Sequence, residues 1–165
     1  MKKHQQGVFL IEALIAILIF SLGILGMVAM GGIAIAAQSD AQYRTEAANY
    51  ANEIASAIAL DIAPANYATE LPDYANRPIP GGTCTFGGSA STKPVVAAWV
   101  DRVTGVTDPK RGLPGATAVS QQIMVDVTPG SGFNKLTITV CWQPPSSAAI
   151  AFAPPHQFTL VSYIN

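Results

Sequence analysis

The stretch QQGVFLIEALIAILIF, from Gln5 to Phe20, holds one acidic residue, Glu12, in a run that is otherwise apolar after Gly7. The 25 residues that follow Glu12, from Ala13 to Ala37, include no charged residue and no proline. A helix of this length rises about 1.5 Å per residue and exceeds the roughly 30 Å hydrocarbon core of a bilayer. The sequence therefore predicts a membrane-inserting helix with a carboxylate near its start.

The flanks of this apolar run predict its orientation. Lys2 and Lys3 precede it, whereas Gln38-Ser39-Asp40 follows it. Basic residues favour the cytoplasmic side, so we expect the N-terminus in the cytoplasm and most of the chain on the opposite side of the membrane. A cleavable secretory signal is the alternative, because Ala34-Ile35-Ala36 has the small-x-small form of a cleavage site. Such signals use only about 7 to 15 apolar residues, so we expect this longer helix to be retained.

The helix is expected to continue beyond the membrane. Residues 38–63 contain no glycine or proline and are rich in alanine, which favours helix. Pro64 then ends the pattern. We expect one helix from Val8 to Ala63 that is apolar all round in residues 8–37 and amphipathic in residues 38–63. Its apolar residues after the membrane recur at spacings of three and four, which places them on one face, and they are Ala47, Ala51, Ile54, Ile58 and Ile62.

The remaining residues predict a small α+β domain. Residues 64–94 are rich in proline and glycine and are expected to form loops with at most short regular pieces. Apolar spacing predicts a short helix from Pro94 to Val103. Period-two alternation predicts an antiparallel sheet that packs on residues 38–63 and turns mainly Thr, Ser and Asp outward. Its strands are expected at Thr117–Thr128, Phe133–Gln143 and Gln157–Ile164, with Pro129–Gly132 as the first hairpin connection.

A family resemblance begins at the N-terminus. A short basic leader ending in Gly7, the sequence Val8-Phe9-Leu10-Ile11-Glu12 and a long apolar helix resemble the class III signal of type IV prepilins and of type II secretion pseudopilins. The resemblance implies that a prepilin peptidase removes residues 1–7, cleaving between Gly7 and Val8, and methylates the new amino group of Val8. It also implies a pilin-like fold in residues 38–165, located in the periplasm before the protein enters a filament from the inner membrane.

The spacing of Glu12 from the cleavage site has a physical reason of its own. A carboxylate in an apolar environment is unfavourable unless it is paired, and cleavage would leave a cationic amine on Val8, one helical turn away. Between staggered subunits, Glu12 of one chain can meet Val8 of its neighbour and set the axial offset. The alternative is an interfacial glutamate that extends to the lipid headgroups.

Later residues narrow the resemblance. The placing of Trp99 before Leu113-Pro114-Gly115, and the sequence TVCWQ around Trp142, are similar to the PilV-type minor pilins, the type IV pilus modification protein group. The expected partners are therefore the inner membrane, prepilin peptidase and other major and minor pilins. Major pilins usually have a proline in the membrane helix, whereas this chain has glycines there, which favours a minor component. Val8 also departs from the more frequent phenylalanine at the start of the mature chain.

The cysteines indicate a covalent link. Cys84 and Cys141 are the only two, and both lie in the part expected outside the cytoplasm, where disulfides persist. We predict that they are bonded, with two buried free thiols as the alternative. Closing a loop of 58 residues restricts the unfolded chain by roughly 4 kcal/mol in the chain-entropy model. With His156 they match no standard metal-ligand spacing, so no metal or other cofactor is expected.

No residue pattern predicts catalysis. His4 would leave with the leader, His156 is expected in a solvated loop, and no G-x-S-x-G, H-E-x-x-H or P-loop motif occurs. Trp99 and Trp142 are expected as core anchors, and Asp101, Asp108 and Asp126 as solvated carboxylates and not calcium ligands.

Charge argues against a nucleic-acid surface, because the chain has 9 Lys or Arg against 10 Asp or Glu. We therefore expect a minor pilin that acts by polymerising, in pilus assembly, adhesion, twitching motility or DNA uptake. A type II secretion pseudopilin shares every N-terminal feature and is the nearest alternative. A membrane-anchored periplasmic enzyme or binding module is the third.

Overall fold

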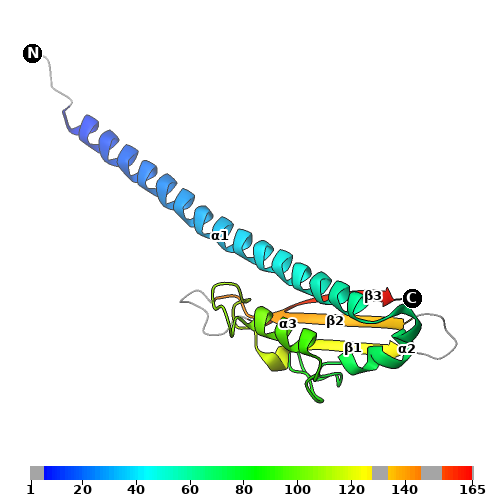
Figure 1. The fold of residues 1–165 in the computed structure, drawn as a ribbon. Helices are drawn as coiled ribbons and strands as arrows, with labels where there is room; N and C mark the ends of the chain where they lie inside the picture. Colours follow the sequence, from blue (N-terminus) through cyan, green and yellow to red (C-terminus); the bar gives the residue numbers. More distant parts are fainter. Residues whose placement is uncertain (1–5, 128–133, 146–153, 165) are drawn as a thin grey trace, which may run out of the picture. The chain divides into compact units, whose positions relative to one another are not determined.

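A computed structural model of the chain describes residues 6–127, 134–145 and 154–164 and divides it into two compact units, Met1–Ala41 and Gln42–Asn165. Helix α1 runs from Gln6 to Asp61 and contributes to both units (Figure 1). These bounds confirm the expected helix from Val8 to Ala63 to within two residues at each end. The chain leaves the helix just before Pro64, whose ring is tolerated only in the first turn of a helix.

In the first unit, the apolar side chains of α1 from Phe9 to Ala37 are largely exposed. From Phe9 to Ala37, no side chain is buried, and Phe9, Leu18 and Met27 are 74%, 58% and 77% exposed. Among the described residues, α1 is the one helix long and apolar enough to cross a membrane. A helix that is apolar on every side needs lipid or other apolar helices around it. The residues of this unit are therefore compatible with a single membrane anchor.

The second unit is built on a three-stranded antiparallel sheet. Its strands are β1 (Gln121–Val127), β2 (Asn134–Trp142) and β3 (His156–Ile164), in the order β1-β2-β3 (Figure 1). The register pairs Ile123 with Ile138, and Ile138 in turn with Leu160. The three expected strands are thus confirmed, and the expected connection Pro129–Gly132 lies outside the described residues.

The first strand begins later than the sequence predicts. Residues Ala118–Ser120 form a short 3-10 helix, η3, and not the start of a strand at Thr117. The cause is a capping box, in which the side chains of Thr117 and Ser120 each bond the backbone of the other. This local pairing satisfies backbone groups that a strand would have to pair elsewhere.

One hydrophobic core joins the amphipathic part of α1 to the sheet and to helix α3 (Pro94–Thr104). All five residues of the predicted helix face are at most 2% exposed, which confirms the assigned periodicity. They pack in one cluster with the inward residues of the strands and with one face of α3. The central partners are Val96, Trp99, Val103, Ile123, Leu136, Ile138, Val140 and Trp142.

The outer face of the sheet differs in part from the sequence prediction. Exposure alternates along β3, as a half-buried strand requires. The outward residues of β3 include Val161 and Tyr163, which are 46% and 60% exposed, whereas Ser162 points to the inner side. The strand therefore presents two sizeable apolar or aromatic side chains to solvent, where the sequence predicted mainly Thr, Ser and Asp.

Loops and short helices connect α1 to α3, as expected. They comprise η1 (Pro64–Asn66), α2 (Tyr67–Glu70) and η2 (Leu71–Tyr74), followed by isolated bridges that pair Asn76 with Ile123 and Ile79 with Gly87.

After α3 the chain turns at Gly105. Its φ of 69° closes the helix in the left-handed conformation that glycine adopts most easily. A Cβ atom on Gly112 would lie 2.5 Å from the backbone of Gly105, so this loop closes on itself only with glycine at residue 112.

Candidate functional site

The residues that the prepilin resemblance selects lie at the start of α1. Gly7 and Val8 fall in its first turn, because the helix begins at Gln6. Glu12 is exposed, four residues after Val8, which corresponds to a rise of about 6 Å along the helix. No hydrogen bond or ion pair joins Glu12 to another described residue. Its neighbours Leu10, Ile11 and Leu14 are each more than 60% exposed, so this carboxylate stands among uncovered apolar side chains.

Other features of the apolar part of α1 also lack long-range partners. The hydroxyl of Ser21 donates to the carbonyl of Ile17 at 2.7 Å, so the helix itself satisfies this polar group. A Cβ atom added at Gly23, Gly26, Gly31 or Gly32 would meet no atom within 4 Å outside the local helix backbone. Nothing within the described chain therefore requires these glycines. Small residues of this kind permit close approach between helices in membranes.

The predicted disulfide is confirmed. Cys84 and Cys141 are bonded, with Cα atoms 5.8 Å apart, and both are buried, at 7% and 1% exposed. The bond attaches the loop before α3 to β2, the central strand. Cys84 has a φ of 58°, in the left-handed region, so the loop takes an unfavourable backbone conformation where the bond holds it.

Buried amide side chains reinforce the same attachment, and no pattern in the sequence predicts them. Gln121 is fully buried, and its side chain donates to the Cys141 carbonyl at 2.9 Å and accepts from the Cys141 N–H at 3.2 Å. Asn76 donates to the Gln121 carbonyl at 2.8 Å and accepts from the Ser91 N–H at 3.1 Å. Because each amide is matched at both ends, burial of these polar groups does not destabilise the unit.

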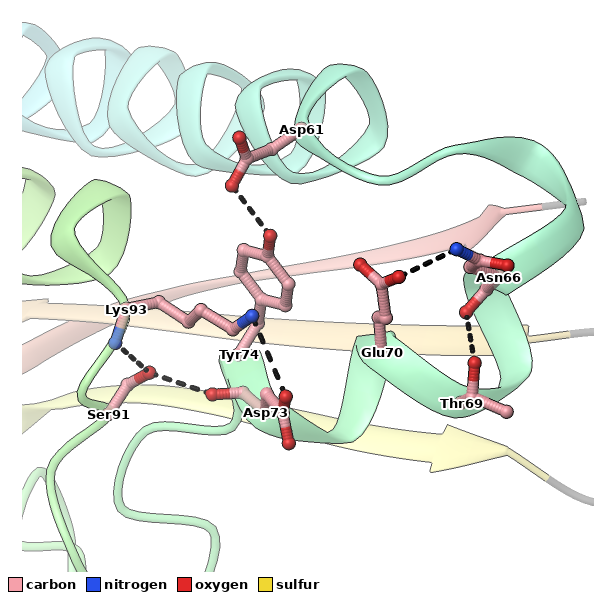
Figure 2. Close-up of polar contacts among 8 residues, drawn as sticks. All are labelled: Asp61, Asn66, Thr69, Glu70, Asp73, Tyr74, Ser91 and Lys93. Atoms are coloured by element: carbon pink, nitrogen blue, oxygen red, sulfur yellow. Dashed lines mark hydrogen bonds and ion pairs between the residues drawn. The ribbon is translucent and has the colours of Figure 1, made fainter.

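A second polar cluster links the end of α1 to η2 and to the loop before α3 (Figure 2). The Tyr74 hydroxyl donates to Asp61 at 2.6 Å. The ammonium of Lys93 lies 4.8 Å from the centre of the Tyr74 ring and 3.5 Å from the Asp73 carboxylate. Burial raises the pKa of the Tyr74 phenol above its ordinary 10.0, and the hydrogen bond to Asp61 raises it further. Tyr74 is therefore a neutral hydrogen-bond donor at physiological pH.

A hollow beside this cluster lies along the loop before α3. It has a volume of about 730 Å³ and is lined mainly by the loop before α3, including Ser89, Ser91 and Lys93. The Ser91 hydroxyl donates to the Asp73 carbonyl at 3.0 Å. A nucleophilic serine needs a base within hydrogen-bonding reach, and a backbone carbonyl cannot take that role.

The two tryptophans anchor the core, as predicted. Trp99 and Trp142 are 0% and 1% exposed. The indole N–H of Trp99 donates to the Tyr50 carbonyl of α1 at 2.9 Å, and the Tyr50 hydroxyl donates to the Arg111 carbonyl at 2.6 Å. Burial, followed by the charges of Glu46 and Glu53, raises the pKa of Tyr50.

The expectation for His156 was wrong. It is the first residue of β3 and half-buried, not a solvated loop residue, and its ring meets that of Trp142 edge-on at 5.7 Å. The preceding Pro154-Pro155 indicated a loop, but pairing of His156 with Trp142 extends the strand to that residue.

The three aspartates considered as calcium ligands are not brought together. Asp101 lies in α3, Asp126 lies in β1, and Asp108 forms an ion pair with Arg111 at 3.5 Å. Within residues 6–127, 134–145 and 154–164, no group of three or more His, Cys, Asp or Glu side chains could hold a metal ion.

Comparisons of this chain with protein-family models, with curated proteins and with solved structures found no match. The resemblance of the N-terminal residues to prepilins therefore rests on the motif itself.

Proposed function

We propose that this protein is a pilin-like subunit, a minor pilin of a type IV pilus, that acts by assembling into a filament and not by catalysis. One observation supports the proposal above all others. The helix that begins with the Gly7-to-Glu12 motif is apolar and has no buried side chain from Phe9 to Ala37, while its continuation is buried on one face by a disulfide-bonded α+β unit. Such a chain supplies one helix to a bundle and one folded unit outside it.

In this proposal, prepilin peptidase removes the leader at the bond between Gly7 and Val8 and methylates Val8. Cleavage creates an α-amino cation on the first turn of α1, close to the carboxylate of Glu12. A lone carboxylate in hydrocarbon is unfavourable by several kcal/mol, at least about 2.5 kcal/mol on insertion scales for aspartate. An amine from a neighbouring subunit lowers that penalty, since opposite charges attract strongly where water is excluded.

The pairing also explains how subunits find their register. Apolar helices alone can slide past one another, because lipid-facing side chains pack in many offsets. A single charge pair is satisfied only when Glu12 of one subunit lies level with Val8 of the next. Gly23, Gly26, Gly31 and Gly32 support close contact between helices, and glycine instead of proline in this part of α1 supports a minor over a major pilin.

A type II secretion pseudopilin would share this mechanism. The two assignments differ in the filament that the subunit joins, and the neighbouring genes and the composition of purified filaments separate them. Co-purification of a tagged copy with sheared pili identifies the pilus assignment and its partner pilins together.

Mass spectrometry of the protein from membranes tests the shared proposal directly. The expected mature chain lacks residues 1–7 and carries one additional methyl group on Val8. A strain without prepilin peptidase provides the matched control and is expected to retain the leader. A chain that begins at Met1 in both strains would exclude the pilin and the pseudopilin alike and would favour a membrane-anchored module.

A further inference from the structure

We propose that the outer edge of β3 binds an extended segment of a different protein, not of a second copy of this chain, and that the segment adds a fourth strand to the sheet. The segment is uncharged, with apolar side chains at alternate residues. This inference concerns the folded unit alone and does not depend on the processing or polymerisation of the chain.

Hydrogen bonding at β1 shows which residues of each strand face which neighbour. Ile123 exchanges both backbone hydrogen bonds with Asn76, at 3.0 and 2.9 Å, so the N–H and C=O groups of Ile123 point away from β2. Residues alternate along a strand, and bonded pairs in an antiparallel ladder alternate with non-bonded ones. The next residue, Met124, therefore directs its N–H and C=O to β2. The N–H and C=O of Thr137, which lies opposite Met124 in β2, point to β1 in the same way.

The same alternation assigns β3. Since the backbone N–H and C=O groups of the odd-numbered residues of β2 point to β1, those of its even-numbered residues point to β3. Ile138, for example, bonds to Leu160. The N–H of Cys141 donates to the side-chain oxygen of Gln121 on the β1 side, which agrees with this assignment. The backbone N–H and C=O groups of Gln157, Thr159 and Val161 therefore point away from β2, to the outer edge of the sheet.

These edge groups have no partner in the described part of the chain. β3 is the last strand of the sheet, and no hydrogen bond is formed by the outward N–H and C=O of Gln157, Thr159 or Val161 with another described residue. At the opposite edge, Asn76 already occupies the equivalent groups of Ile123. The row on β3 repeats every second residue, which is the spacing that an extended chain presents and that a small ligand does not.

The edge also lacks the features that usually prevent strand addition. Pairing with β2 is continuous from Asn134–Ile164 to Trp142–His156, so no bulge twists the edge away. The strand HQFTLVSYI contains no proline and no lysine, arginine, aspartate or glutamate. Proteins commonly protect an exposed edge with short strands, bulges, proline or charge. A regular nine-residue edge without any of them is suited to strand addition.

A groove beside the edge indicates the chemistry of the incoming segment. It has a volume of about 390 Å³ and lies between α1 and the last residues of β3. Ala55, Ser56 and Ala59 provide small side chains on the helix side, and none of the lining residues is charged. On an added strand, alternate side chains would enter this groove, while the others would lie beside the exposed Val161. Apolar, uncharged side chains therefore fit the groove better than charged ones.

A peptide-binding experiment on the full chain in detergent micelles tests the proposal. The probe is a fluorescein-labelled nonapeptide of alternating valine and threonine with two terminal lysines for solubility. We expect saturable binding by fluorescence anisotropy, and no binding of the same peptide with prolines at its third and sixth residues. Val161→Pro removes an outward N–H without removing a hydrogen bond to β2 and is expected to weaken binding at least tenfold. Val161→Thr, which keeps the N–H and the branched Cβ, is the matched control.

Val161→Lys keeps the test decisive if proline disturbs the fold, because it places a charge at the same edge and leaves every backbone group in place. We expect it to weaken binding at least tenfold as well. Equal affinity of wild type and Val161→Lys, or no saturable binding by the wild type, would overturn the proposal. The wild type could instead form dimers that the probe dissociates and that Val161→Lys abolishes. That result would identify a second copy of this chain as the occupant and would contradict the assignment to a different protein.

Discussion

The two parts of helix α1 have opposite relations to the rest of the chain. From Phe9 to Ala37, no side chain is buried, although nearly all are apolar. From Gln42 to Asp61, one face is fully buried by the sheet and by α3, and the remaining faces carry polar or small side chains. The same backbone conformation thus continues through two environments. Helix formation is local, whereas burial depends on what the rest of the chain provides.

Under the proposed function, this difference separates effects on assembly from effects on the stability of the folded unit. Changes in the exposed apolar part should alter assembly and leave unfolding unchanged. Changes on the buried face should do the reverse. Trp99 and Trp142 are the only two tryptophans and both lie in the second unit, so tryptophan fluorescence reports the unfolding of that unit alone.

The largest expected effect follows replacement of Glu12. Glu12→Ala removes the proposed partner of the neighbouring amine and should lower incorporation into sheared filaments at least tenfold, because an unpaired buried charge is destabilising by about 3 to 5 kcal/mol. Cleavage after Gly7 should be unchanged. Immunoblots of sheared and membrane fractions measure both quantities. Ser21→Ala, which removes a polar side chain from the same helix, is the control. If Glu12→Ala entered filaments at the wild-type level, the charge-pair account would be wrong.

Loss of the disulfide should have the next largest effect, on the second unit. Cys141→Ala opens the covalent loop and should lower the free energy of unfolding by roughly 4 kcal/mol on the chain-entropy model. Urea titration of the full chain in micelles, followed by tryptophan fluorescence, measures it. Treatment of the wild type with a reductant should produce a similar shift. A midpoint that moves in neither case would show that hydrogen bonds such as those of the Asn76 side chain hold this loop without the disulfide.

Matched truncations compare the two parts of α1 directly. Ile58→Ala leaves a cavity in the core and should lower the free energy of unfolding by about 2 to 5 kcal/mol. Leu18→Ala makes a similar truncation where the side chain is 58% exposed and should change it by less than about 0.5 kcal/mol. Both are measured by the same urea titration. Equal effects of the two would mean that the exposed part of α1 is also packed against the folded unit.

The smallest effect concerns the Tyr74 hydroxyl. Tyr74→Phe removes its hydrogen bond to Asp61 and should destabilise the unit by roughly 1 kcal/mol at pH 7. Because the pKa of Tyr74 is raised in the folded state, unfolded chains lose this proton first as the pH increases. Its contribution to stability is therefore complete below about pH 10 and is lost above it.

Urea titrations at pH 8 and pH 11 measure this dependence. The wild type should lose more stability between the two pH values than Tyr74→Phe. Equal losses would assign the pH dependence to other groups, such as Tyr50, whose pKa is also raised.

Much of the fold could be predicted from periodicity. The spacing of Ala47, Ala51, Ile54, Ile58 and Ile62 identified the buried helix face, and alternation identified three strands. Both succeed because a regular element repeats its buried side at a fixed period. The start of β1 was misplaced because Thr117 and Ser120 form a capping box. Two hydroxyl residues within an apolar run do not by themselves predict such a cap. His156 was misplaced because its partner, Trp142, comes from another strand.

The candidate site divides in the same way. Gly7, Val8 and Glu12 lie within one or two turns, so their relation was readable along the chain. The contacts of Asp61 with Tyr74 and of Gln121 with Cys141 join residues 13 and 20 apart through side chains of common polar types, which leave no periodic signal. Disulfide pairing was predictable only because two cysteines allow one bond.

The sequence by itself determined that this chain has three strands and a long helix with an apolar first part and an amphipathic second part, because these properties depend on the local order of residues. Tertiary structure decided which of those surfaces the chain covers. It placed the sheet on residues 42–61 of α1, paired Asn76 with Ile123 at one edge of that sheet, and left the outward backbone groups of Gln157, Thr159 and Val161 at the other edge without a partner among the described residues. The physical reason is that strand order and edge pairing depend on contacts between residues far apart in the sequence, and periodicity along one strand does not encode its neighbour.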